Sequence, residues 1–135
     1  MKFMTYLLFL PVISVFILST YAEDTVPDIS IPRAAVCADV QAREPVGSDV
    51  NFPETSKKIF FFTEIKSSFP GTIKHVWYYK NTKLGEIELE YGAGQYRTWS
   101  YHVINPGQTG EWKVEATING NNVIKRLIFA VGIEE

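Results

Sequence analysis

Apolar and polar side chains alternate along much of the chain with the two-residue period of β-strands. The clearest example spans residues 84–91. In it three glutamates take one face and three apolar residues take the other, namely Glu86, Glu88 and Glu90 against Ile87, Leu89 and Tyr91. Such alternation is typical of an antiparallel strand with one solvated face. We interpret the glutamates as that solvated face, the alternative being a metal-binding or catalytic cluster.

Seven segments have a strand-like pattern, and turn residues separate them. The segments are 31–42, 59–66, 73–80, 84–91, 95–102, 111–118 and 123–131. Asn105-Pro106-Gly107 and Asn119-Gly120 are strong turn signals between them. Residues 48–57 form a predicted polar loop, anchored in the core by Phe52-Pro53. No segment has a helical period, so we predict an all-β, Ig-like antiparallel β-sandwich of about seven strands.

The aromatic-rich segments 59–66 and 73–80 hold the densest core-forming sequence. A hairpin of the two, with Lys66 opposite Ile73, would pair Glu64 with His75, Phe62 with Trp77 and Phe60 with Tyr79. In an Ig-type sandwich the two segments lie in different sheets instead. Phe60 and Phe62 then meet Trp77 across the core. Both arrangements place Glu64 and His75 at the same end of the aromatic layer.

Glu64 and His75 are polar residues inside apolar segments, which makes them candidate ligand-binding residues. One interpretation is a structural ion pair or hydrogen bond that includes Arg33, Arg43 or Arg97, because a charge at the edge of a core is costly unless it is paired. The other is a polar centre in a cleft, where His75 beside a carboxylate would titrate near neutral pH. The pair lacks a nucleophile and an oxyanion site, so we name no catalytic residue.

Arg97, Trp99 and Tyr101 share one face of segment 95–102 and are further candidate ligand-binding residues. One interpretation is a core-facing strand with an arginine at its rim. The other is an exposed aromatic platform for a sugar ring or a peptide, where the aromatic faces stack and the arginine donates hydrogen bonds.

The first residues have the pattern of an export signal. Lys2 precedes an apolar run over 6–18, which is shorter than the ~20 residues of a membrane-spanning helix, and small residues lead to Ala22. We predict a signal peptide over 1–22, a linker over 23–30 and a sandwich domain over 31–135. The alternative is an uncleaved membrane anchor; after cleavage we expect no stable membrane insertion.

Composition narrows the range of partners. Removal of 1–22 takes away one lysine and no acid, which leaves 113 residues with 12 basic and 15 acidic side chains and a net charge of −3. This is one domain, large enough to bury a core. The mild negative charge, with no basic stripe, argues against nucleic acid or an anionic membrane surface as the partner.

Cys37 is the only cysteine, so the chain forms no internal disulfide. We predict that it is a small buried hydrophobe. The alternatives are an intermolecular disulfide or a reactive thiol, although no base stands near it in the sequence. The chain has no P-loop, GxSxG, CxxC or HExxH signature, and its two histidines stand 27 residues apart. We therefore predict no cofactor and no metal site.

Six short sequence motifs within residues 33–131 occur in the same order as the motifs of the DUF2914 family, which consists of bacterial domains of unknown function. They are Arg33-Ala34-Ala35-Val36; Arg43-Glu44-Pro45-Val46; Phe60-Phe61-Phe62-Thr63-Glu64-Ile65; His75-Val76-Trp77-Tyr78-Tyr79; Arg97-Thr98-Trp99-Ser100; and Gly110-Glu111-Trp112-Lys113-Val114. The chain resembles that family. The resemblance implies an Ig-like sandwich at a bacterial cell envelope, in this chain alone behind a signal peptide, and it implies no activity. With the export signal, it leads us to expect a periplasmic or secreted protein.

These observations give one leading hypothesis and two alternatives. The leading hypothesis is a non-catalytic envelope module that binds a protein or a glycan. One alternative is a small envelope enzyme using Glu64 and His75, which needs both side chains in a concave site with open space between them. The other is a purely structural accessory protein. The sequence does not determine the oligomeric state.

Overall fold

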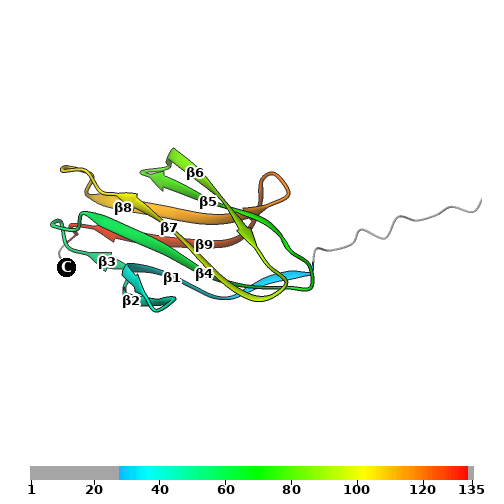
Figure 1. Cartoon of the computed structure of the whole chain (residues 1–135). Helices are drawn as coiled ribbons and strands as arrows, with labels where there is room; N and C mark the ends of the chain where they lie inside the picture. Colours follow the sequence, from blue (N-terminus) through cyan, green and yellow to red (C-terminus); the bar gives the residue numbers. More distant parts are fainter. Residues whose placement is uncertain (1–27, 134–135) are drawn as a thin grey trace, which may run out of the picture.

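A computed structural model describes residues 28–133, which form two antiparallel-rich sheets packed face to face as a β-sandwich (Figure 1). The strands are β1 (Ile29–Gln41), β2 (Glu44–Ser48), β3 (Asn51–Phe52), β4 (Lys58–Ser67), β5 (Gly71–Tyr79), β6 (Thr82–Tyr91), β7 (Gly94–Val103), β8 (Gly110–Ile118) and β9 (Asn122–Val131). The four-stranded sheet has the order β2-β1-β4-β7, and the five-stranded sheet has the order β3-β9-β8-β5-β6. The predicted all-β sandwich is confirmed.

The two strands beyond the predicted seven, β2 and β3, lie between the predicted strands 31–42 and 59–66, where no strand was expected. β2 contains Pro45, whose missing N–H is tolerated because β2 is an edge strand with a partner on one side only. β3 is two residues long and pairs in parallel with the end of β9. Phe52 of β3 is buried and packs edge-on against Phe129, so the predicted anchor is confirmed. β1 already begins at Ile29, within the range predicted as a linker.

β4 and β5 lie in different sheets, so the hairpin alternative, with Lys66 opposite Ile73, is wrong. β4 pairs with β1 and β7, and β5 pairs with β6 and β8. Each strand is therefore central in its own sheet. A central strand is bonded on both edges, and the middle of each outer face is also buried, at Phe62 of β4 and Val76 of β5. This is consistent with apolar residues on both faces of each strand. The sandwich alternative for these two strands is confirmed.

The face of β4 that enters the core is the one opposite to our expectation. Phe61, rather than Phe60 and Phe62, meets Trp77 across the core, with ring centroids 6.5 Å apart in an edge-to-face arrangement. Three consecutive phenylalanines leave the alternation ambiguous by one residue, and a one-residue shift exchanges the two faces of a strand. Phe60 and Phe62 lie on the outer face of the four-stranded sheet, which is the face directed away from the five-stranded sheet.

The core consists of large side chains contributed by both sheets. Its fully buried members include Phe61, Trp77, Trp112 and Phe129. The rings of Trp112 and Phe129 stack at 6.0 Å, and Trp77 meets Phe129 edge-on at 6.3 Å. Among the described residues no helix is long and apolar enough to cross a membrane.

Candidate functional site

His75 points from β5 into the core between the sheets and is completely buried. Its ring lies 4.3 Å from that of Phe61. Its Nε2 atom lies 3.1 Å from the hydroxyl of Thr63 on β4, and its Nδ1 atom lies 2.7 Å from the hydroxyl of Ser100 on β7. Both partners belong to the opposite sheet, so His75 is a polar link between the two layers.

The surrounding hydrogen bonds determine the tautomer of His75. The Thr63 hydroxyl donates to the carbonyl of Thr98 at 3.1 Å, so its oxygen is left to accept a hydrogen bond from the Nε2–H group of His75. The indole N–H of Trp77 donates to Ser100 Oγ at 3.2 Å, which leaves the Ser100 hydroxyl to donate to Nδ1. Every buried polar side-chain atom within residues 28–133 has a hydrogen-bond partner. The network is therefore complete with a neutral imidazole.

Burial also keeps this imidazole neutral. Desolvation disfavours the charged form and lowers the pKa of His75 from 6.5 to about 3. The ring thus carries no charge at neutral pH, and both of its nitrogens are engaged within the core. In this position His75 contacts no open cleft.

Glu64 lies on the outer face of the four-stranded sheet, directed away from the core that holds His75. It stands between two arginines in adjacent strands. The register places Arg33 of β1 and Arg97 of β7 on either side of it. Glu64 Oε2 is 3.5 Å from Arg33 Nε, and Oε1 is 3.3 Å from Arg97 Nε. The side chain is only 14% exposed. The expected ion pair of Glu64 with Arg33 and Arg97 is present, but His75 has no part in it.

Glu44 completes this charge cluster from the tip of the β1–β2 hairpin. Its carboxylate contacts Arg33 at 2.6 Å and Arg97 at 2.9 Å. The hydrogen bond from Arg33 lowers the pKa of the Glu44 carboxyl below its ordinary value. The backbone partner of Glu44 is Gln41, far along β1 from Arg33. The hairpin tip therefore folds back over the outer face of the sheet, which accounts for the complete burial of Phe62 beneath Arg33.

Arg97, Trp99 and Tyr101 lie in a row on this outer face. Trp99 is the cross-strand neighbour of Phe62, and Tyr101 is the neighbour of Phe60. The rings of Tyr101 and Phe60 are 5.5 Å apart, and Lys58 Nζ lies 4.6 Å from the centre of the Tyr101 ring. Tyr101 is 53% exposed. We call Lys58, Phe60, Trp99 and Tyr101 the aromatic strip.

The predicted candidates thus divide between two places. Arg97, Trp99, Tyr101 and Glu64 share the outer face, whereas His75 lies on the inner side of the sandwich. The alternation within segment 95–102 was enough to group Arg97, Trp99 and Tyr101. Lys58 and Glu44 were missed, because they reach the same face from the start of β4 and from a hairpin tip. In the sequence, each of them is simply a polar residue next to a strand boundary, which is too common a feature to single them out.

Cys37 is buried on β1 beside Phe60, as predicted for a small hydrophobe. Burial raises the pKa of its thiol to about 11. The thiolate is the reactive form of cysteine, so this thiol is inert at neutral pH.

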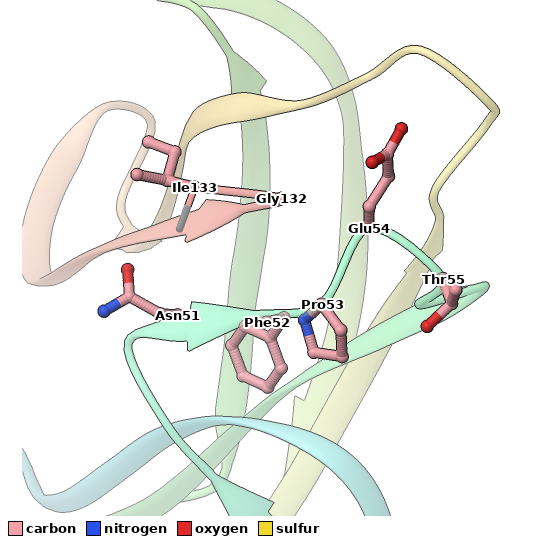
Figure 2. A pocket seen from close by; sticks show the side chains of 7 residues that line it. All are labelled: Asn51, Phe52, Pro53, Glu54, Thr55, Gly132 and Ile133. Carbon is pink, nitrogen blue, oxygen red and sulfur yellow. The ribbon is translucent and has the colours of Figure 1, made fainter. Parts of the chain in front are cut away.

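Two hollows are relevant to a search for a site. One, of about 440 Å³, lies between β3, the loop that follows it and the end of β9; Figure 2 shows its lining residues, which include Asn51, Glu54 and Ile133. It contains none of the predicted candidates. The other, of about 220 Å³, is lined by Arg43, Glu64, Gln95 and Arg97 and adjoins the charge cluster. The described residues contain no group of three His, Cys, Asp or Glu side chains placed to hold a metal ion.

The fold defines an Ig-like β-sandwich module. Residues 70–131, which include β5 to β9, match the model of the family described as "Protein of unknown function (DUF2914)". The predicted resemblance to the DUF2914 family is therefore confirmed over residues 70–131. The matched range contains three of the six motifs that suggested it. No curated protein matches the sequence.

Several solved structures resemble the sandwich at low sequence identity. The CARDB domain of a Pyrococcus furiosus protein, in complex with di-metal ions, has a TM-score of 0.46 and 14% identity over 78% of this chain and 93% of that one. The GH3 β-glucosidase of Bifidobacterium adolescentis has a TM-score of 0.44 and 8% identity, over 79% of this chain and 17% of the enzyme. The β-glucosidase of Kluyveromyces marxianus in complex with glucose has a TM-score of 0.45 and 11% identity, over 77% of this chain and 14% of the enzyme. These likenesses concern the fold alone.

Proposed function

We propose that this protein is a non-catalytic binding module of the bacterial cell envelope. It holds a protein or glycan ligand on the outer face of its four-stranded sheet. The observation that carries the proposal is the aromatic strip, where the exposed ring of Tyr101, the partly exposed rings of Phe60 and Trp99, and a lysine form one continuous row beside Arg97. A flat row of rings offers stacking surface, and the cations favour a ligand with carboxylate or other acidic groups.

The charge cluster supports this role by fixing the surface beside the strip. Arg97 is held by Glu44 and Glu64, so its guanidinium is positioned without a ligand. A positioned side chain loses little conformational entropy on binding, which favours affinity. The strip lies on regular strands, and sites on strands are held more rigidly than sites on loops.

The competing enzyme hypothesis needs Glu64 and His75 around one open space. In the described fold the two project to opposite sides of the four-stranded sheet, and both nitrogens of His75 bond to core residues. We therefore favour binding over a Glu–His reaction.

A binding screen with matched variants tests the proposal. Glycan arrays and pull-downs from envelope extracts would identify the ligand, and titration would then compare Tyr101→Ala with Ile128→Ala. These two residues are equally exposed, at 53% and 54%, but they lie on different sheets. We expect Tyr101→Ala to weaken binding by ~10-fold or more and Ile128→Ala to have no effect. Equal effects of the two variants would place the site elsewhere, and turnover without any ligand capture would favour the enzyme.

The envelope location rests on the pattern of residues 1–22, which lie outside the described residues. Intact-mass measurement of the protein from fractionated cells tests it. We expect periplasmic or secreted material that begins at Glu23. Protein that stays with the membrane fraction and retains residues 1–22 would support the anchor alternative instead.

A further inference from the structure

β7 is a long edge strand of the four-stranded sheet. All ten of its residues pair with β4, from Ser67↔Gly94 to Lys58↔Val103, without a register shift. On its other side β7 has no strand partner within residues 28–133. A straight edge of this length presents a row of free backbone donors and acceptors.

The alternation of hydrogen bonds between β7 and β4 shows which residues of β7 have their backbone groups free on the outer edge. Ile104 N donates to Lys57 O at 2.9 Å, so the even-numbered positions at this end of β7 are bonded to β4. Bonded and non-bonded pairs alternate along an antiparallel ladder. The odd-numbered residues therefore direct their N–H and C=O groups outward: Gln95, Arg97, Trp99, Tyr101 and Val103. These are also the residues whose side chains lie on the outer face.

The other edges of the sandwich carry features that block strand addition, and β7 lacks them. β6 has a register shift and a row of glutamates, and β2 contains Pro45. β9 is covered by β3 at residues 130–131 alone, and along the rest of its length it carries Lys125 and Arg126. Natural edge strands use such bulges, charges, prolines and covers to prevent pairing. β7 has neither a proline nor a shift, and its one charged residue is Arg97. Its edge is therefore competent for pairing.

We propose that β7 pairs antiparallel with β7 of a second copy of this chain, with Trp99 on the two-fold axis. Trp99 then lies opposite Trp99 of the second copy, and Arg97 lies opposite Tyr101 of the second copy. The cross-strand row of Phe62 and Trp99 then continues into the same row of the second copy. Arg97 of each copy gains Tyr101 of the other as an aromatic neighbour. The two four-stranded sheets become one continuous sheet.

Self-complementarity of β7 is what identifies the occupant as a second copy. In this register residues 95–103 of one copy all pair with residues 95–103 of the other. Arg97, the single charged residue of β7, does not lie opposite Arg97 of the second copy. An axis at Arg97 would place two like charges face to face, which is unfavourable. This inference does not rest on the proposed ligand-binding function.

Charge variants at the axis test the pairing. Sedimentation equilibrium of protein purified from cells expressing the full chain is expected to give a concentration-dependent dimer. Trp99→Lys and Trp99→Glu should each weaken self-association by roughly 100-fold, because two like charges meet at the axis. An equimolar mixture of these two variants should form a heterodimer, since Lys then lies opposite Glu. A protein that stays monomeric at every concentration, or variants that dimerise unchanged, would overturn the proposal.

A backbone test separates edge pairing from side-chain contact. Tyr101→Pro removes an outward N–H and leaves the bonds to β4 intact, whereas Tyr101→Ala removes the ring alone. We expect the proline variant to dissociate the dimer by at least ~10-fold more than the alanine variant, with both equally folded by circular dichroism. Equal dissociation would exclude strand pairing. Ligand binding by either variant is a separate readout, so failure of the dimer and failure of the proposed function are distinguishable.

Discussion

His75 bonds to the buried hydroxyl groups of both Thr63 and Ser100, so it is expected to contribute strongly to stability. His75→Ala leaves a cavity and removes hydrogen bonds from buried hydroxyl groups. We expect the free energy of unfolding to fall by about 3 kcal/mol in urea denaturation. His102→Ala is the matched control, because His102 is only half-buried and bonds to a neighbouring backbone carbonyl. Equal losses for the two histidines would contradict the role of the network.

Glu64 supports a second prediction at the same scale. Glu64→Gln removes one of the two carboxylates that Arg33 and Arg97 share and leaves Glu44 as the other, and the lost charge is the mostly buried one. We expect a loss of about 1–2 kcal/mol, measured by the same denaturation. Glu86→Gln is the control, because Glu86 also contacts two cations but is 36% exposed, and exposed pairs contribute about 0–1 kcal/mol. A larger loss for Glu86→Gln would contradict this account of burial.

The sequence identified these polar residues but not their partners. A polar side chain within an apolar run must be paired, which is why Glu64 and His75 were selected. The partners of His75 stand 12 and 25 positions away, and they are common hydroxyl residues without a distinguishing pattern. Only the packing of one sheet on the other brings them together. The arginine partners of Glu64 were predictable because charge complementarity restricts the choice.

The three phenylalanines of β4 provide the test at the scale of an element. Phe61 enters the core between the sheets, whereas Phe60 lies in the aromatic strip on the outer face. We expect Phe61→Ala to lower the free energy of unfolding by about 3–5 kcal/mol. Phe60→Ala should cost clearly less, because the Phe60 ring is only partly buried. A greater loss for Phe60→Ala would show that the two faces of β4 are exchanged.

The strands were predicted well from the sequence where one face of the strand is solvated, and less well elsewhere. The alternation of β6 and the turns around β8 were sufficient to place those strands. β4 has fully buried aromatic residues on both faces, Phe61 on the inner and Phe62 on the outer one, so periodicity carried no information about which face enters the core. β2 and β3 are short edge strands: β2 pairs with the strand directly before it, whereas the pairing of β3 depends on β9, which is distant in the chain.

At the scale of the whole molecule, the predicted sandwich followed from the number of strands and the absence of helical periodicity. The outer face was less accessible to sequence reasoning. Arg97, Trp99 and Tyr101 were grouped by their spacing, but their exposure depends on which sheet β7 joins and on the β1–β2 hairpin that folds over the neighbouring strands. The residue pattern of one strand does not specify which other elements cover that strand.

The stability of the molecule is expected to depend on pH through His75. Burial lowers the folded-state pKa to about 3 from 6.5, so well above pH 6.5 the ring is neutral in both states and this contribution to stability is complete. As the pH falls from 6.5 towards 3, the unfolded chain binds a proton that the folded chain does not. The free energy of unfolding should then decrease by up to about 1.4 kcal/mol per pH unit.

The window between pH 6.5 and pH 5 isolates this effect from the carboxyl groups. Those of Asp39, Glu44 and Glu86 have pKa values lowered from 3.8 or 4.5, so they remain ionised there. Denaturation at pH 7.5 and pH 5 should show a loss of about 2 kcal/mol for the unmodified protein and for His102→Gln. His75→Asn, which has no titrating ring, should lose almost none. If His75→Asn loses as much as the unmodified protein, then a different group is responsible, and His75 is not the buried neutral link between the sheets.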